Sequence, residues 1–138
     1  MILLDTNVVS EPLKPQPDAQ LLKWINAQVI ESLFLPSVVL AEWLTGVEKL
    51  PTGRRKTEME LLIHDFLGEV IGPRILPFDR QAAEVHATLM AKTSVIGKTP
   101  SFADCQIAAI ALVHRFTVAT RDTAPFLVMG VPVIDPWQ

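Results

Sequence analysis

The chain has 138 residues, the length of a single domain, and its 12 Lys and Arg against 15 Asp and Glu give a formal net charge of −3. Hydrophobic residues make up 49% and charged residues 20%, which excludes an intrinsically disordered chain. One cysteine and three scattered histidines exclude a disulfide framework and a zinc site, and no apolar run approaches the roughly 20 residues that span a bilayer. We therefore expect a cytoplasmic protein with no membrane contact.

The first half of the chain alternates short apolar strands with helices. Residues 2–4 form a predicted strand that ends at Asp5, the first of three turn- and cap-forming residues. Apolar residues at helical spacing over 21–29 predict a helix, and 33–35 predict a second buried strand. A further helix is predicted to begin at Pro36-Ser37 and to run over 36–50.

The second half continues the same alternation. Thr57 and Glu60 fit a capping box at the start of a helix that we expect to end at Gly72-Pro73. Asp79 caps a helix that ends near residue 97, and Ser101 caps one over 102–114 whose apolar character all round indicates a buried central helix. The strands expected here are 75–76, 116–119 and 131–134. The alternation predicts an α/β fold with a parallel sheet covered on both faces.

Four carboxylates are predicted at one end of this sheet. Asp5 follows the first strand, Asp122 the fourth, Glu42 lies on the helix after the second, and Asp104 begins the helix that leads to the fourth. Ligands bind beyond the carboxyl ends of parallel strands, where such acids would repel one another by about 4 kcal/mol per pair at ~4 Å. Oxygen ligands without histidine or thiolate suit Mg²⁺ or Mn²⁺. Such an ion activates water and stabilises a leaving oxygen, which fits phosphodiester hydrolysis.

Each acid also has a purely structural explanation. Asp5 can be a helix cap, Ser101 with Asp104 a capping box, and Asp122 a solvated turn residue. Glu42 is harder to explain, because a lone carboxylate among apolar neighbours is rare unless it is paired or binds metal. Without these four, 11 acids remain against 12 basic residues. The net acidity would then be local and would not oppose binding of nucleic acid.

At these residues the sequence resembles PIN-domain ribonucleases, specifically the VapC and FitB type of toxin from type II toxin–antitoxin pairs. The resemblance covers nearly the whole chain. It rests on four motifs in order, which are Leu4-Asp5-Thr6-Asn7, Ala41-Glu42 with Gly46-Val47, Ala103-Asp104 with Ile107-Ala108-Ala109, and Ala119-Thr120-Arg121-Asp122. The ending Val133-Ile134-Asp135-Pro136-Trp137 is similar to the FitB subgroup.

The resemblance implies a single PIN domain over 1–138, with a five-stranded parallel sheet covered by helices on both faces, assembled as a homodimer. It implies a toxin that cuts RNA with Mg²⁺ or Mn²⁺ through metal-activated water. A small antitoxin inhibits such toxins by packing its tail along an apolar groove and placing a basic side chain in the acidic pocket. The acids that carry over as catalytic and metal-binding are Asp5, Glu42, Asp104 and Asp122. Among them Asp5 and Asp104 are the implied direct ligands, supported by the hydroxyls of Thr6 and Thr120.

Some features depart from the family pattern or stand outside it. Pro125 precedes Phe126 where many relatives carry a further acid or amide, so one-metal and two-metal chemistry both stay open. Ser101-Phe102 is bulkier than the small residues often found before the third acid. The one basic cluster, 53–56, is interpreted as a solvated loop in preference to an RNA-contacting arm, and Cys105 as a small core residue.

The alternative function is a catalytically weak PIN-like module that binds RNA or a protein partner while its carboxylates hold an ion. Two other folds with a strand-end aspartate fit poorly. A haloacid-dehalogenase-type phosphatase needs a second acid where this chain has Asn7, and a phosphorelay receiver needs a lysine after the last strand, which the chain lacks.

Overall fold

The computed structural model describes residues 1–138 and contains a five-stranded sheet in the order β3-β2-β1-β4-β5, with every neighbouring pair parallel. The strands are β1 Ile2–Leu4, β2 Leu33–Pro36, β3 Ile75–Leu76, β4 Thr117–Ala119 and β5 Val133–Ile134. The predicted α/β fold with a parallel sheet is therefore confirmed. The last strand is shorter than expected because the Val131 N–H donates to the Phe126 carbonyl oxygen at 3.0 Å instead of pairing in the sheet.

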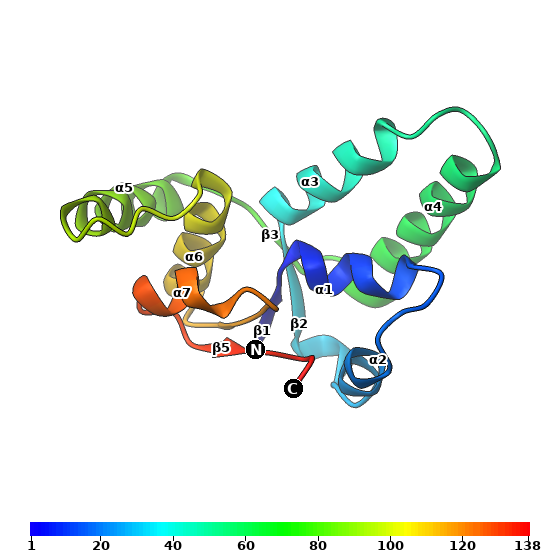
Figure 1. The fold of residues 1–138 in the computed structure, drawn as a ribbon, viewed down its shortest axis with the longest axis horizontal. Coiled ribbons are helices and arrows are strands. Elements are labelled where there is room, and N and C mark those ends of the chain that lie inside the picture. The colour runs from blue at the N-terminus through cyan, green and yellow to red at the C-terminus, as the bar shows by residue number, and fades with distance from the viewer.

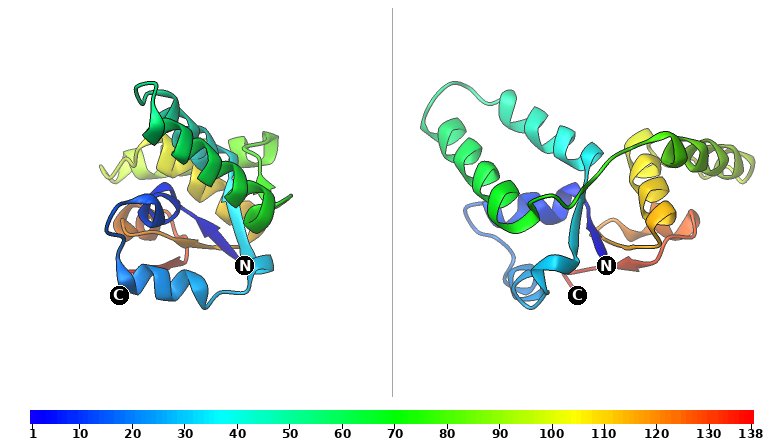
Figure 2. Two further views of the ribbon diagram at one scale, coloured as in Figure 1. Left: turned by 90° about the vertical axis from the view of Figure 1, so that its right-hand side faces the viewer. Right: turned by 180° about the vertical axis from the view of Figure 1, so that it is seen from behind.

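Seven α-helices flank the sheet on two sides (Figure 1, and Figure 2 from two further directions). They are α1 Thr6–Ser10, α2 Ala19–Asn26, α3 Ser37–Glu48, α4 Arg54–Asp65, α5 Arg80–Val95, α6 Phe102–His114 and α7 Thr123–Val128. Short 3₁₀ turns η1 (Glu11–Leu13) and η2 (Ile30–Ser32) follow α1 and α2, and a π-helical segment η3 (Phe66–Ile71) continues α4. Right-handed crossovers explain why α1 to α4 lie on one side of the strands and α5 to α7 on the other. No helix is both long and apolar enough to cross a bilayer.

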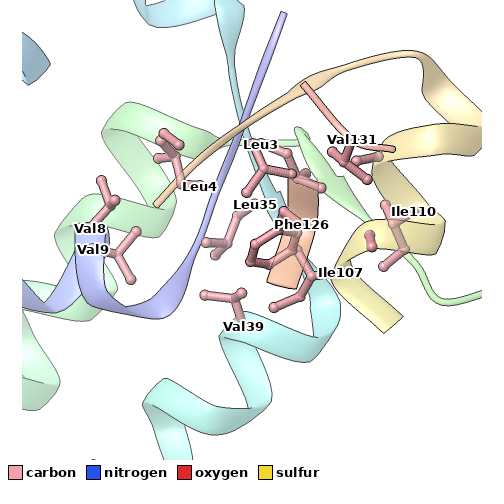
Figure 3. Packing of buried hydrophobic residues seen from close by; sticks show 14 of the residues in the cluster. Leu3, Leu4, Val8, Val9, Leu35, Val39, Ile107, Ile110, Phe126 and Val131 are labelled. Atoms are coloured by element: carbon pink, nitrogen blue, oxygen red, sulfur yellow. The ribbon is translucent and has the colours of Figure 1, made fainter. Parts of the chain in front are cut away.

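The core lies between the strands and helices α1, α3, α6 and α7, as Figure 3 shows in part. Helix α6 has six buried residues, which confirms the prediction of a central helix; these are Cys105, Ile107, Ala108, Ala109, Ile110 and Ala111. Phe126 of α7 is fully buried and lies near Leu3, Leu35 and Ile107. One hydrophobic cluster therefore joins strands β1 and β2 to helices α6 and α7.

The start of α4 differs from the prediction. The helix begins at Arg54, three residues before the expected capping box, with Gly53 as its N-cap. Thr57 lies inside the helix, where its hydroxyl donates to the Gly53 carbonyl oxygen at 3.1 Å, so it caps nothing. The helical segment ends where expected, because η3 continues α4 up to Gly72, whose φ of 54° suits glycine better than any residue with a Cβ.

Two further predictions about helices are wrong. Helix α2 ends at Asn26, and Val29, placed in it by the periodicity, is 66% exposed. Helix α7 was missed, because its six residues span fewer than two turns and include Pro125. A proline in the first turn of a helix is tolerated, since the N–H it lacks would have no intrahelical partner there.

Candidate active site

The acidic residues gather where the strand order reverses. From β1 the chain moves to β2 and β3 on one side and returns to β4 on the other side of β1. Leu4 pairs with Ala119, and the Asp5 N–H donates to the Ala119 carbonyl oxygen at 3.1 Å, so the two strands end side by side. Such a reversal point is where parallel sheets bind ligands.

A buried threonine connects the ends of β1 and β4. The Thr120 hydroxyl is fully buried and donates to Asp5 Oδ2 at 2.8 Å, while Oγ1 accepts from the Asp122 N–H at 3.1 Å. It also accepts from Asn7 Nδ2 at 3.4 Å. The other oxygen, Asp5 Oδ1, accepts from the Thr6 N–H at 2.8 Å and caps α1. Both oxygens of Asp5 are therefore fixed, although a cap alone would use only one.

Asp104 combines a capping contact with a carboxylate that interacts with another acid of the site. Its backbone N–H donates to Ser101 Oγ at 3.1 Å, as the capping interpretation predicts. The Asp104 side chain is half-buried in the first turn of α6, and its carboxylate interacts with Ser101 and with the charge of Asp122. Asp122 is exposed at the start of α7, and its side chain does not cap that helix. The structural and the functional explanations of Asp104 are thus compatible.

Glu42 lies on the outer surface of α3, contrary to the sequence argument. Ala41, Glu42 and Leu44 are exposed, and only Trp43 of this stretch is buried. The acid is therefore not isolated among buried apolar residues. Its connection to the site comes from the charges of Asp5 and Asp104 and from the Thr6 hydroxyl.

Burial and mutual repulsion raise the pKa of three of these acids. The pKa of Asp5 is raised mainly by burial and further by the charges of Asp104 and Asp122. The hydrogen bonds from the Thr120 hydroxyl and the Thr6 N–H oppose this shift. The strand-end acid is thus strained electrostatically even though its oxygens are hydrogen-bonded.

The same repulsion raises the pKa of the acids on α3 and α6. The pKa of Glu42 is raised by partial burial and then by the charges of Asp5 and Asp104. The pKa of Asp104 is raised by burial and by Asp122, against the effect of Ser101. All four predicted site residues therefore share one electrostatic neighbourhood, which is the kind of environment typical of functional sites.

The donor set fits a hydrated divalent cation. No three Asp, Glu, His or Cys side chains are arranged so that they hold a metal ion together. The repelling carboxylates nevertheless favour a cation, and the buried Thr6 hydroxyl lies beside Glu42. Mg²⁺ commonly binds one or two carboxylates directly and keeps several waters, so fewer than three direct protein ligands suffice.

Comparison with known proteins identifies the family. The PIN domain family matches residues 2–130. The chain belongs to the PIN-domain family. It is 44% identical to the VapC ribonuclease Y4jK of Sinorhizobium fredii and 39% identical to Toxin FitB of Neisseria gonorrhoeae, each match covering 100% of this chain and 99% of the relative. The crystal structure of FitAcB from Neisseria gonorrhoeae superimposes with a TM-score of 0.91 at 39% identity, covering 100% of this chain and 99% of that one. The resemblance to VapC and FitB toxins is thus confirmed.

Sequence reasoning treated one residue of this PIN domain only as part of a motif. Asn7 donates to Thr120 through Nδ2, and its Oδ1 accepts from the Arg121 N–H at 3.3 Å. It therefore ties α1 to the loop that carries Asp122. The position of Asn7 directly after Asp5 and Thr6 was the available signal. Periodicity does not reveal that its side chain contacts the residues that follow the fourth strand.

Three hollows lie beside two of the four acids of the PIN domain, Glu42 and Asp122. Glu42 borders an open groove between α1, α3 and α4, and also a shallow depression between α3 and α6. Asp122 borders a third hollow, between α7 and the loop before α6. The site is therefore open to the surface at Glu42 and at Asp122.

Cys105 and Trp43 belong to the hydrophobic core, and Trp24 packs against it. Cys105 is fully buried in α6, and burial raises the pKa of its thiol, as expected of an inert core residue. Trp43 is buried and packs edge-on against Phe66 at 5.5 Å between ring centroids. Trp24 is half-buried against the core.

Proposed function

We propose that this PIN domain is the toxin of a type II toxin–antitoxin pair and acts as an endoribonuclease that hydrolyses RNA phosphodiester bonds with Mg²⁺ or Mn²⁺. The observation that carries the proposal is the gathering of four acids at the strand-order reversal, with the pKa of three of them raised. The relatives named VapC ribonuclease and Toxin FitB support the same activity.

The acids divide into two groups in this proposal. Asp5 and Asp104 would hold the divalent ion directly, and Glu42 and Asp122 complete the acidic pocket. Thr120 fixes the Asp5 carboxylate in place through its 2.8 Å hydrogen bond. When bound, the ion lowers the pKa of water and offsets charge on the leaving oxygen.

Protein partners form the second part of the proposal. The similar solved structures include FitAB of this family bound to a DNA fragment, which supports a small antitoxin as the partner of this chain. A homodimer is supported by large apolar side chains exposed on the side of α5, α6 and α7, namely Val95, Ile96, Phe102, Leu127 and Val128. Analytical ultracentrifugation of the purified chain tests the dimer.

The activity is tested with the purified chain freed of any antitoxin. We expect cleavage of single-stranded or structured RNA in Mg²⁺ or Mn²⁺, no cleavage in EDTA, and none by Asp5→Ala or Asp104→Ala. Growth arrest on expression should also disappear in Asp104→Asn. Cleavage that survives EDTA, or that is unchanged in both variants, contradicts the mechanism.

A catalytically weak binding module is the second candidate. The observation in its favour is that no three potential ligands are arranged to hold a metal ion together. RNA binding without any cleavage, in both metals and on varied substrates, would assign the chain to this second class.

A further inference from the structure

An unpaired arginine lies beside the acidic site, in the loop that follows β4. Arg121 stands between Thr120 and Asp122 and is exposed. None of the three ion pairs of the chain includes it, and its guanidinium donates no hydrogen bond. Its Cζ lies over the ring of Trp137, 5.2 Å from the ring centroid. Because the ring offers no oxygen acceptor, the N–H donors of the guanidinium stay available for a ligand.

Both partners of this contact are fixed at the edge of the sheet that carries the acids. The Arg121 N–H donates to Asn7 Oδ1 at 3.3 Å, and the backbone N–H of the preceding residue donates to the Ile134 carbonyl oxygen at 3.0 Å. Trp137 packs against the core, and its N–H donates to Asp135 Oδ1 at 2.9 Å. In the left view of Figure 2 the C-terminus lies on the same side of the strands as α1, away from the N-terminus. The guanidinium is therefore oriented before any ligand binds.

The charge of Arg121 is not used to neutralise the acids. It is absent from the charges that shift the pKa of the three acids described above, whereas these acids and Asp122 act on one another. Asp122 follows directly in the chain, with its Cα about 3.8 Å from that of Arg121. Asp135 accepts from the Trp137 N–H and forms no ion pair with Arg121. The site therefore combines carboxylates suited to a divalent cation with a single free cation beside them.

We propose that Arg121 binds the RNA phosphate next to the cleaved one and that Trp137 is the positioning residue that holds its guanidinium, an inference that rests on the proposed nuclease function. An RNA strand whose cleaved phosphate lies at the acids places its neighbouring phosphate beside them, where Arg121 is available. A guanidinium binds two phosphate oxygens at once, and the indole restricts its orientation without using its donors.

The charge of Arg121 also favours the substrate over the inhibitory partner. The partner implied by the family resemblance places a basic side chain in the acidic pocket. An arginine cannot bind such a side chain, whereas it attracts every phosphate of an RNA strand. The free donors of Arg121 therefore fit the substrate better than the inhibitor.

The test measures binding of a fluorescein-labelled single-stranded RNA of about 12 nucleotides by anisotropy across a KCl series. The protein carries Asp104→Asn throughout, so that the RNA stays intact. We expect Arg121→Ala to weaken binding about ten-fold and to reduce the slope of log K against log salt by about 0.7, the value for one phosphate contact on a single strand. Arg121→Lys should keep the slope and recover part of the affinity. The matched control Arg115→Ala removes the same charge at the opposite edge of the sheet, before β4, and should change affinity by less than about two-fold.

A double-mutant cycle tests the positioning role of Trp137. Trp137→Leu removes the aromatic face, so binding should weaken about two- to five-fold while the salt slope stays unchanged. In the Arg121→Ala background the same substitution should have no further effect on RNA binding. An equal loss in both backgrounds means that Trp137 contacts the RNA itself or acts only through the fold, and it overturns the positioning role.

Kinetics with Asp104 intact provide a readout that does not depend on the substituted acid. Arg121→Ala should raise KM and leave kcat nearly unchanged, because a contact made equally in ground and transition states affects binding alone. The variant keeps the backbone N–H that donates to Asn7, and the lost side chain is exposed, so the thermal transition should change little. A fall in kcat at unchanged KM would make Arg121 a transition-state contact and overturn the assigned role.

Further outcomes separate the inference from the proposed function. If Arg121→Ala matches Arg115→Ala in both assays while the chain still cuts RNA, the inference is wrong and the proposed function stands. If Arg121→Ala weakens only a complex with a protein partner, the arginine belongs to that interface. If Lys98→Ala causes the loss instead, the RNA crosses the hollow between α7 and the loop before α6, which Lys98 borders. Absence of both RNA binding and cleavage in the unmodified chain refutes the proposed function together with this inference.

Discussion

Replacing Thr120 by valine removes one buried hydroxyl without changing the shape of the side chain much. The hydroxyl donates to Asp5 Oδ2 at 2.8 Å and accepts from the Asp122 N–H at 3.1 Å and from Asn7 at 3.4 Å. The variant loses all three contacts at once. It therefore tests whether the Thr120 hydroxyl holds the ends of β1 and β4 together.

The magnitude follows from the charge on the acceptor. A hydrogen bond to a charged group contributes about 1.5–3 kcal/mol, whereas Asp122 is exposed and its N–H can bind water instead. We therefore expect the free energy of unfolding to fall by about 2 kcal/mol, which corresponds to a decrease in Tm of about 6–10 °C for a chain of this size.

The cost should also depend on pH. The Thr120 hydrogen bond lowers the pKa of Asp5, which burial raises above its ordinary value of 3.8. The bond favours the ionised carboxylate, so its contribution is complete well above the raised pKa and is lost as pH falls through it.

Urea unfolding followed by circular dichroism at neutral and acidic pH measures both effects. Thr117→Val makes the same change at a half-buried position of β4 that does not contact the acids, and it should cost little. A Thr120→Val protein as stable as Thr117→Val, or a cost independent of pH, refutes the assigned role.

Three further outcomes follow from the same contacts. Asp104→Asn should raise the urea midpoint of the metal-free protein at pH 7, and the gain should vanish as pH falls through the raised pKa of Asp104; a constant gain would contradict the repulsion. Mg²⁺ should raise Tm at pH 7 by an amount that EDTA reverses and that Asp5→Asn reduces; an equal rise in both proteins excludes Asp5 as a ligand. Glu11→Ala should lower the free energy of unfolding by about 2 kcal/mol, because buried Glu11 accepts from Lys14 Nζ and the Asp18 N–H. Glu11→Gln should recover part of this stability, and an equal loss in both variants would exclude a role for the oxygen acceptor that glutamine keeps.

Most of the fold could be predicted because strong local signals agreed with the tertiary structure. Helix α6 begins at its Ser101 cap and ends at His114, as expected from an all-round apolar segment. Helix α4 could not be placed correctly, because Thr57 and Glu60 have the sequence of a capping box but lie inside a helix that starts at Arg54. The first turn of α4 contains Lys56, which contacts the Glu48 carbonyl oxygen, and sequence spacing does not reveal such a contact.

The order of strands and helices predicted the positions of the acids better than local chemistry did. Asp5 and Asp122 were predicted together because parallel strands end at the same edge of a sheet, and the register of β1 with β4 places their strand ends side by side. Glu42 was selected for a supposed burial that the structure contradicts, since α3 exposes it. What joins Glu42 to the site is the charge of Asp5 and Asp104 together with the Thr6 hydroxyl. A linear pattern does not show which face of a helix lies opposite which acid.

Part of the acidity behind the net charge of −3 is concentrated at one site of this structure. Burial and mutual repulsion raise the pKa of Asp5, Glu42 and Asp104, so each group favours the folded state when protonated and opposes it as pH rises through its raised pKa. The repulsion among these acids costs stability in the metal-free fold. Their gathering at the strand-order reversal fits a functional role, because a bound cation converts the same repulsion into affinity. The stability gained by Asp104→Asn and the affinity for Mg²⁺ lost with it should therefore appear in the same variant.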